Sequence, residues 1–160
     1  MSSPSEFRPP STLLLREVPA HTGTAGGQIL APVLTAALRE ASAVRCRVYV
    51  LSDLAGPAAA PPLAAALVET DPAAHRARLR ALTVIGPYRG LGLERRLLGE
   101  LLTELRAAGV RQVCYRAEPG AGDLPALLRS SGFTGDERTP CQYDEPGIGP
   151  LAVTWLIREL

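Results

Sequence analysis

Residues 84–98 read V-I-G-P-Y-R-G-L-G-L-E-R-R-L-L, and this stretch decides the fold of the chain. It passes from an apolar strand through a glycine-spaced turn into a helix with a leucine stripe. A helix that begins after such a turn leaves several backbone N–H groups without partners, all directed at one small volume. Phosphate and pyrophosphate groups bind such N–H groups. The stretch therefore predicts a site for a phosphate-bearing cofactor.

Strands are predicted on both sides of this helix. The helix is predicted over residues 91–108, with Gly109 at its C-terminal cap, and the strands over residues 76–85 and 110–117. A strand, a helix and a strand in this order form a βαβ unit, whose two strands are parallel. Ligands of parallel sheets bind beyond the carboxyl ends of the strands. The turn at residues 86–92 is expected there.

The strand predicted at residues 76–85 carries three arginines at every second position. Strict alternation places one set of side chains on each face, Arg76, Arg78 and Arg80 against Ala77, Leu79 and Ala81. Such a row usually forms a solvated face. As a functional element it favours an acidic substrate, because guanidinium pairs well with carboxylate or phosphate.

The remaining elements follow from hydrophobic patterning and turn residues. Residues 1–11 are expected to form a flexible tail and residues 12–160 a single domain. Asp123 is the predicted N-cap of a short helix that ends before Gly132. The other predicted elements are strands at residues 12–18, 45–51 and 63–70, helices at 28–41 and 123–131, and a final strand pair at 141–143 and 152–157.

Composition excludes several functional classes. The net charge of +1 and the 4% of aromatic residues argue against nucleic-acid binding. No apolar run approaches the ~20 residues that cross a bilayer, so we expect a cytoplasmic protein with no membrane partner. Cys46, Cys114 and Cys141 with His21 and His75 lack zinc spacing, so no metal is expected. All 17 basic residues are arginines, which excludes a Schiff-base or P-loop lysine.

The turn resembles the signature of the GNAT-type N-acetyltransferases, Arg/Gln-x-x-Gly-x-Gly/Ala between the fourth strand and the third helix. Arg89, Gly90, Leu91 and Gly92 match this pattern, and Ile-Gly-Pro at residues 85–87 matches the segment before it. The Gly-Phe pair at residues 132–133 fits the same family. The resemblance is sharpest over residues 82–133.

The resemblance implies an α/β fold with a mixed, mostly antiparallel sheet and helices on both faces. Its central parallel pair, the fourth and fifth strands, is expected to splay apart. It also implies transfer of an acyl group, most often acetyl, from acyl-CoA to a primary amine of a small molecule or peptide. Backbone groups of Thr83, Val84 and Ile85 would then contact the pantetheine and the thioester. The predicted pyrophosphate site comprises Arg89, Gly90, Leu91, Gly92, Leu93 and Glu94.

Glu94 departs from the family pattern, which has glycine or alanine at this position. Without ligand, its carboxylate complements the positive end of the helix. With pyrophosphate bound, it would repel the ligand unless Arg89, Arg95 or Arg96 pairs with it. Alternatively, its side chain bends outward and CoA binds normally.

The acid and base are the second departure. Leu128 stands where the family often has a tyrosine acid, and Ala121 where an asparagine is common. Tyr115, or alternatively Tyr143, is a candidate acid, and Glu69 is the candidate base, with Asp71 and His75 behind it in the sequence. These departures leave two further possibilities, a noncatalytic partner-binding or regulatory module and a transferase for a larger acyl group. The last strand, with Trp155, either pairs across a homodimer or holds a buried tryptophan at a sheet edge.

Overall fold

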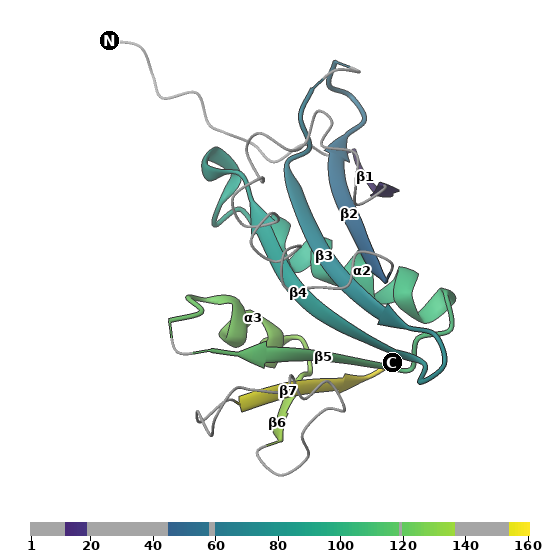
Figure 1. Cartoon of the computed structure of the whole chain (residues 1–160). Helices are drawn as coiled ribbons and strands as arrows, with labels where there is room; N and C mark the ends of the chain where they lie inside the picture. Colours follow the sequence, from purple (N-terminus) through teal and green to yellow (C-terminus); the bar gives the residue numbers. More distant parts are fainter. Residues whose placement is uncertain (1–11, 19–44, 58–59, 119, 137–153) are drawn as a thin grey trace.

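The computed structural model describes residues 12–18, 45–57, 60–118, 120–136 and 154–160. Within them, seven strands form one sheet in the order β1-β2-β3-β4-β5-β7-β6 (Figure 1). Neighbouring strands are antiparallel, except that β4 and β5 are parallel. The strands are β1 (Leu13–Val18), β2 (Cys46–Asp53), β3 (Ala64–Asp71), β4 (Arg76–Val84), β5 (Gln112–Ala117), β6 (Thr134–Asp136) and β7 (Thr154–Glu159).

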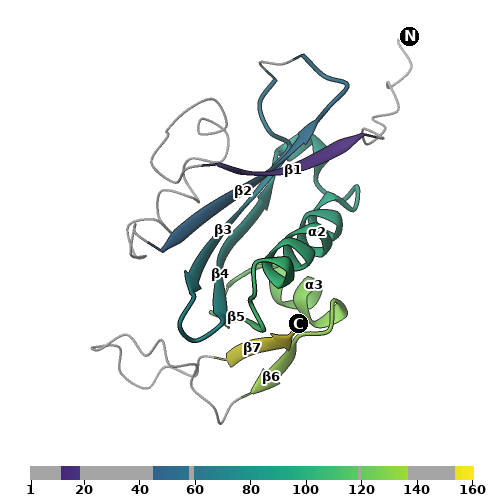
Figure 2. The ribbon, with the colours of Figure 1, turned by 90° about the vertical axis from the view of Figure 1, so that its right-hand side faces the viewer.

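Among the described residues, helices α2 (Leu93–Ala107) and α3 (Leu124–Ser130) cover one face of this sheet. Helix α2 buries its leucine stripe against β3 and β4, and α3 lies on the same side (Figure 2). This helical face carries Val113, Tyr115 and Leu156, which join the main core. The opposite face carries a separate cluster of Cys114, Trp155 and Ile157. The two faces therefore differ in what they offer to a ligand.

A β-bulge interrupts β4 in its middle. Leu67 of β3 pairs with Ala81, whereas Val68 pairs with Leu79, so Arg80 is an extra residue in β4. The predicted alternation, with Leu79 and Ala81 on one face, is therefore wrong: their partners are consecutive residues of β3 and lie on opposite faces. A bulge also bends its strand and re-aims a side chain.

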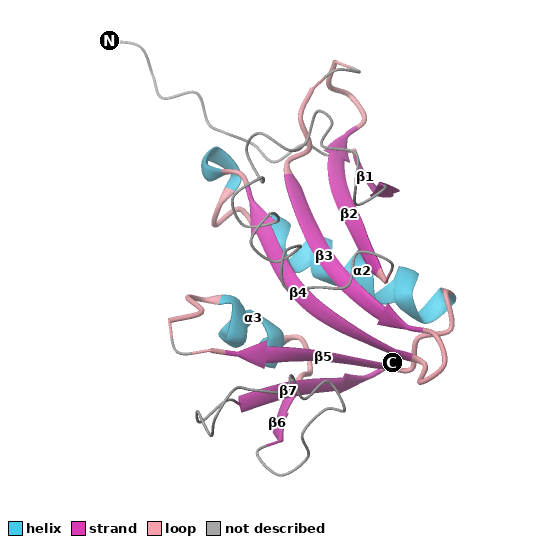
Figure 3. Ribbon diagram, viewed as in Figure 1, coloured by secondary structure: helices cyan, strands magenta, loops and turns pink. Residues whose placement is uncertain are grey.

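The parallel pair separates immediately beside this bulge. Strands β4 and β5 pair over residues 76–79 and 112–115, and the last pair is Leu79 with Tyr115. Beyond it, β4 continues to Val84 while β5 remains paired with β7 through Ala117. The two strands diverge as a V (Figure 3), and we call the position of the last pair the vertex. The predicted splayed pair is confirmed.

Predicted strands and helices within the described residues are confirmed to within two residues at each end. The helix predicted at residues 28–41, the strand at 141–143 and the tail at 1–11 lie outside the described residues. The sequence analysis missed β6, which pairs with β7. Strand β7 is flanked by β5 and β6, so Trp155 is not at a sheet edge. In the described part of the chain, no helix has the length and apolarity needed to cross a membrane.

Candidate functional site

The turn between β4 and α2 begins with a short 3-10 helix, η1 (Gly86–Tyr88). Gly90 and Gly92 follow with φ angles of 75° and 80°, and Gly92 is the N-cap of α2. Residues other than glycine rarely adopt such φ angles. A Cβ atom at either position would have no neighbour within 4 Å, so the glycines are required by the backbone conformation and not by crowding.

The start of α2 presents a row of backbone donors. The first helical hydrogen bond runs from the Arg96 N–H to the Gly92 carbonyl, at 3.1 Å. Across the described residues, no hydrogen-bond acceptor contacts the six amides of residues 90–95. These donors lie at the positive end of a 15-residue helix. This arrangement has the chemistry that binds an anion such as a diphosphate.

The end of β4 supplies a second set of backbone groups. The Ile85 N–H donates to the Leu63 carbonyl on the β3 side, at 2.9 Å. Backbone groups of successive strand residues point alternately to the two sides, so those of Val84 and Leu82 face the opening toward β5. Those of Thr83, like those of Ile85, turn to β3. The Arg89 Nε atom donates to the Val84 carbonyl at 3.1 Å and thereby ties the turn to the strand end.

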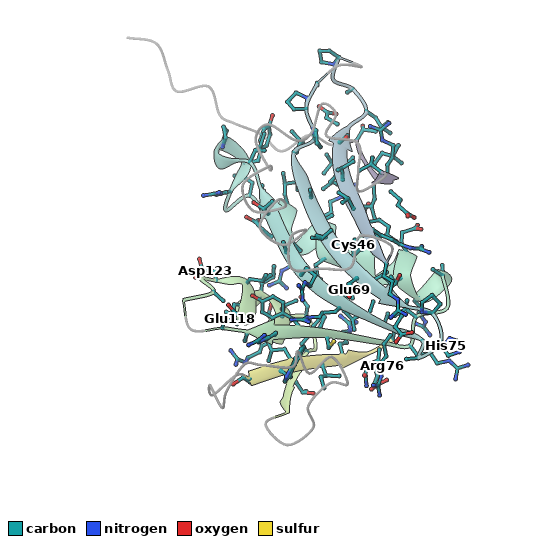
Figure 4. The ribbon with its side chains drawn as sticks, viewed as in Figure 1. Cys46, Glu69, His75, Arg76, Glu118 and Asp123 are labelled. Atoms are coloured by element: carbon teal, nitrogen blue, oxygen red, sulfur yellow. The ribbon has the colours of Figure 1, made fainter. Side chains whose placement is uncertain are left out.

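Charged side chains gather on the opposite face of the sheet at the vertex. Glu69 pairs in register with Arg78, which in turn pairs with Cys114. The Glu69 carboxylate lies 4.0 Å from the Arg80 Nε atom, with side-chain exposures of 13% and 4%. Figure 4 shows Glu69 on β3 beside Cys46 of β2. Burial, and secondly the charge of Glu69, raise the pKa of the Cys46 thiol, which therefore stays protonated.

Arg78 and Arg80 do not form a solvated face, and that interpretation is wrong. Arg78 is 6% exposed, and its guanidinium carbon lies 5.1 Å from the ring centre of Trp155, a cation–π contact. Arg116 pairs in register with Trp155. Its Nε atom lies 3.7 Å from the Oε1 atom of Glu118. The bulge and the β5–β7 pairing, which bring these groups together, involve long-range strand pairing that a single-sequence pattern does not contain.

Tyr115 lies at the vertex on the helical face, paired with Leu79 and 8% exposed. Burial, and to a lesser degree the charge of Glu118, raise the pKa of its hydroxyl, so it remains protonated at neutral pH. Glu69 and Tyr115 therefore flank the vertex from the two faces of the sheet. One offers a carboxylate and the other a proton donor.

Solved structures resemble this arrangement. A proposed acyl-CoA N-acyltransferase from Klebsiella pneumoniae subsp. pneumoniae is 12% identical, with a TM-score of 0.70 over 92% of this chain and 97% of its own. An IAA acetyltransferase from Bacillus cereus is 16% identical, with a TM-score of 0.64 over 93% and 100%. A GNAT family acetyltransferase from Elizabethkingia anophelis with acetyl-CoA bound is 12% identical, with a TM-score of 0.63 over 94% and 99%. No family model and no curated protein matches the sequence.

The chain has the GNAT fold. At these identities the likeness confirms the expected architecture, including the parallel β4/β5 pair. Activity, acceptor and catalytic residues need evidence from the site itself.

One departure from the GNAT pattern is a core residue. Leu128 is fully buried in the main core, so the position where GNAT enzymes often have a tyrosine acid provides packing and no proton donor. Ala121 lies in the turn before α3. Tyr143 lies outside the described residues.

The other departure, Glu94, lies in the first turn of α2 and is partly buried. The three arginines considered as its partners bond elsewhere: Arg89 to Val84, Arg95 to Ser130 and Arg96 to Glu100. No ion pair among the described residues includes Glu94. None of these three arginines therefore neutralises the Glu94 carboxylate.

His75 lies away from the opening, at the end where β4 and β5 are joined (Figure 4). Asp71 lies at the same end, because it pairs with Arg76, which pairs with Gln112. His75 is an exposed turn residue whose Nδ1 atom lies 3.2 Å from the Gly109 carbonyl. The Asp71 carboxylate accepts hydrogen bonds from the backbone N–H groups of Ala73 and Ala74. Asp71 therefore stabilises the β3–β4 turn, and His75 links this turn to the connection between α2 and β5. Glu69 remains the candidate base.

Proposed function

We propose that this protein is an acyl-CoA-dependent N-acyltransferase, which moves an acyl group, most often acetyl, to a primary amine. One observation carries the proposal: β4 parts from β5 beside a helix start whose six amides have no acceptor among the described residues. This combination offers backbone groups at the end of β4 that do not face β3, followed by helix-start amides that can bind a diphosphate. GNAT proteins, including the acetyl-CoA-bound relative, share the architecture.

The residues present fit coenzyme A. The amides of residues 90–95 would hold the pyrophosphate, and the backbone groups of Leu82 and Val84 that face the opening would hold the pantetheine. When bound, the thioester supplies an activated acyl group. The free lone pair of the Val84 carbonyl and its N–H remain available, because Arg89 takes one acceptor position of that carbonyl.

Glu69 and Tyr115 divide the proton transfers between them. Glu69, at the vertex on the opposite face, accepts the proton that the acceptor amine loses on acylation. Tyr115, held protonated by burial on the helical face, donates a proton to the departing sulfur. The Val84 N–H donates to the oxygen on which negative charge develops. Each role uses a group that lies within the splayed region or at its vertex.

A noncatalytic GNAT-fold module is the second candidate, and Glu94 with Leu128 favours it. A carboxylate beside the amides weakens binding of a diphosphate, and a buried leucine removes the common acid. The two candidates differ first in whether acyl-CoA binds.

Thermal unfolding with acetyl-CoA tests the proposal. A ligand at 100 times its dissociation constant stabilises the folded state by about 2.7 kcal/mol. We expect a rise in Tm with acetyl-CoA that is smaller for Arg89→Ala, because that side chain anchors the turn to β4. Arg111→Ala is the matched control, an exposed arginine at the joined end of the strands. No rise in Tm at millimolar acetyl-CoA would favour the noncatalytic module.

A further inference from the structure

We propose that the chain has a second ligand site, separate from the start of α2, where a small organic carboxylate with a short apolar body binds. The site is a cavity of about 270 Å³ at the C-terminal end of α2. The end of α2 and the α2–β5 connection meet the β3–β4 turn and the start of β2 there. Figure 4 shows His75 and Arg76, two residues of its wall, at the end where β4 and β5 are joined.

The length of α2 separates this cavity from the row of amides. The helix has 15 residues, which at ~1.5 Å per residue places its two ends about 22 Å apart. The amides of residues 90–95 lie at one end, whereas Leu105 and Ala108 line the cavity at the other. The two sites therefore do not overlap, and the proposal does not depend on acyl transfer.

Basic residues dominate the polar part of the cavity wall. Arg47, His75 and Arg76 line it. Of the described residues that line it, Asp71 alone is acidic, and its Oδ1 atom already accepts two backbone N–H groups of its own turn. The C-terminal end of α2 adds about half a unit of negative charge, which is less than one guanidinium offsets. The balance of charge favours an anion.

Arg47 supplies the guanidinium that the ligand would meet. It pairs in register with Val68, which pairs with Leu79, so its side chain lies on the helical face, where α2 ends. Its Nη1 atom lies 3.6 Å from the Oε2 atom of Glu17, and it also interacts with the Tyr49 hydroxyl. The ion pair is exposed, and exposed pairs contribute little. Because a guanidinium has five N–H donors, these two partners leave donors for a carboxylate.

The apolar part of the wall sets the kind and the size of the ligand. Leu105 and Val110 are buried, and Ala108 and Pro72 lie in the same wall. Such a surface favours a hydrocarbon group beside the carboxylate. At the ~30 Å³ that one water molecule occupies in the liquid, the cavity has room for about nine non-hydrogen atoms. Benzoate and 4-methylpentanoate have this size and chemistry.

His75 joins two of the segments that border the cavity. Its Nδ1 atom lies 3.2 Å from the Gly109 carbonyl oxygen, which can only accept, so Nδ1 carries the hydrogen. Its own carbonyl accepts the Arg111 N–H at 2.8 Å. Its φ angle of 52° lies in the left-handed region, which is uncommon outside glycine. These contacts hold the β3–β4 turn against the end of α2, so the cavity is formed before a ligand enters.

Isothermal titration with benzoate and 4-methylpentanoate tests the proposal, with benzamide and 4-methylpentanamide as neutral counterparts. We expect the Kd of each carboxylate to be lower than that of its amide by about tenfold or more. Arg47→Gln should raise the Kd of benzoate about ten- to a hundredfold, because hydrogen bonds to a charged group are lost. Arg111→Gln is the matched control and should leave the Kd unchanged, since this exposed arginine follows Val110 and is not among the described residues of the wall.

Backbone amide signals in NMR spectra locate the bound carboxylate. Benzoate should shift the signals of Gly109 and Val110 and leave those of Gly90 and Gly92 in place. This measurement distinguishes the cavity from the amides at the start of α2, which also attract anions. Shifts at Gly90 and Gly92 without shifts at Gly109 and Val110 would overturn the proposal.

A second substitution makes the test independent of Arg47. Ala108→Phe places a large side chain in the cavity wall at the exposed C-cap of α2, and it should weaken benzoate binding by about tenfold or more. Ala107→Phe is its control, one exposed residue earlier and not among the described residues of the wall. Melting curves without ligand show whether each variant folds. Equal Kd values for benzoate and benzamide, no carboxylate binding at millimolar concentration, or binding that survives both Arg47→Gln and Ala108→Phe would each overturn the proposal.

Discussion

Glu94 offers a prediction with two effects of opposite sign. Replacing it by glutamine keeps the size of the side chain and removes its charge. Without ligand, the carboxylate in the first turn of α2 stabilises the helix by about 0.3–1 kcal/mol, so Glu94→Gln should lower the free energy of unfolding by that amount. With CoA, the same substitution removes a repulsion and should tighten binding.

The repulsion follows from the position of Glu94 among the free amides. A diphosphate on residues 90–95 would lie about 7 Å from the carboxylate, given a rise of ~1.5 Å per residue and the length of the side chain. At a dielectric constant between ~40 and ~80, each pair of unit charges costs about 0.6–1.2 kcal/mol. With about two charges on the diphosphate, Glu94→Gln should lower the Kd for CoA roughly ten- to fiftyfold.

Isothermal titration with CoA measures this change, and chemical denaturation without ligand measures the change in stability. Glu104→Gln is the matched control, an exposed carboxylate on the same helix beyond its first turn. Raising the salt concentration should shrink the effect of Glu94→Gln on binding, because screening weakens exposed charges. An unchanged Kd at low salt would refute the reasoning and show that the side chain bends away from the ligand.

Three further predictions concern the vertex and the core. Glu69→Gln should lower kcat by about 10²–10⁴-fold while leaving the Kd for CoA unchanged, and steady-state kinetics with titration of CoA check both. Tyr115→Phe should lower kcat. The variant should also lose less free energy of unfolding than the wild-type protein as the pH becomes alkaline. Because the folded-state pKa of Tyr115 is raised, its contribution is fully present below the unfolded value near ~10 and is lost as the pH rises above it. Denaturation curves between neutral and alkaline pH measure this difference. An equal loss of unfolding free energy in the wild-type protein and in Tyr115→Phe would contradict it. Leu97→Ala, at a fully buried position of α2, should cost about 2–5 kcal/mol of unfolding free energy in urea denaturation.

Local sequence was sufficient where local geometry decides the structure. The stripe from Leu93 to Leu105 predicted α2, because residues three and four apart share one face of a helix. Gly90 and Gly92 predicted the turn, because positive φ angles strongly favour glycine. The strand–helix–strand order predicted the parallel pair, since a crossover helix brings two strands together in the same direction. The proposed diphosphate site rests on these three features.

Tertiary structure decided what happens at the vertex. The alternating pattern of β4 predicted a solvated row of arginines, but the bulge at Arg80 and the strand pairing around it bury Arg78 and Arg80 beside Glu69. Strand order and register depend on contacts between residues far apart in the chain, so no local pattern contains them. The sequence by itself determined the glycine turn and the helix start where we propose that a diphosphate binds, and the folded sheet decided which charged groups lie beside the vertex.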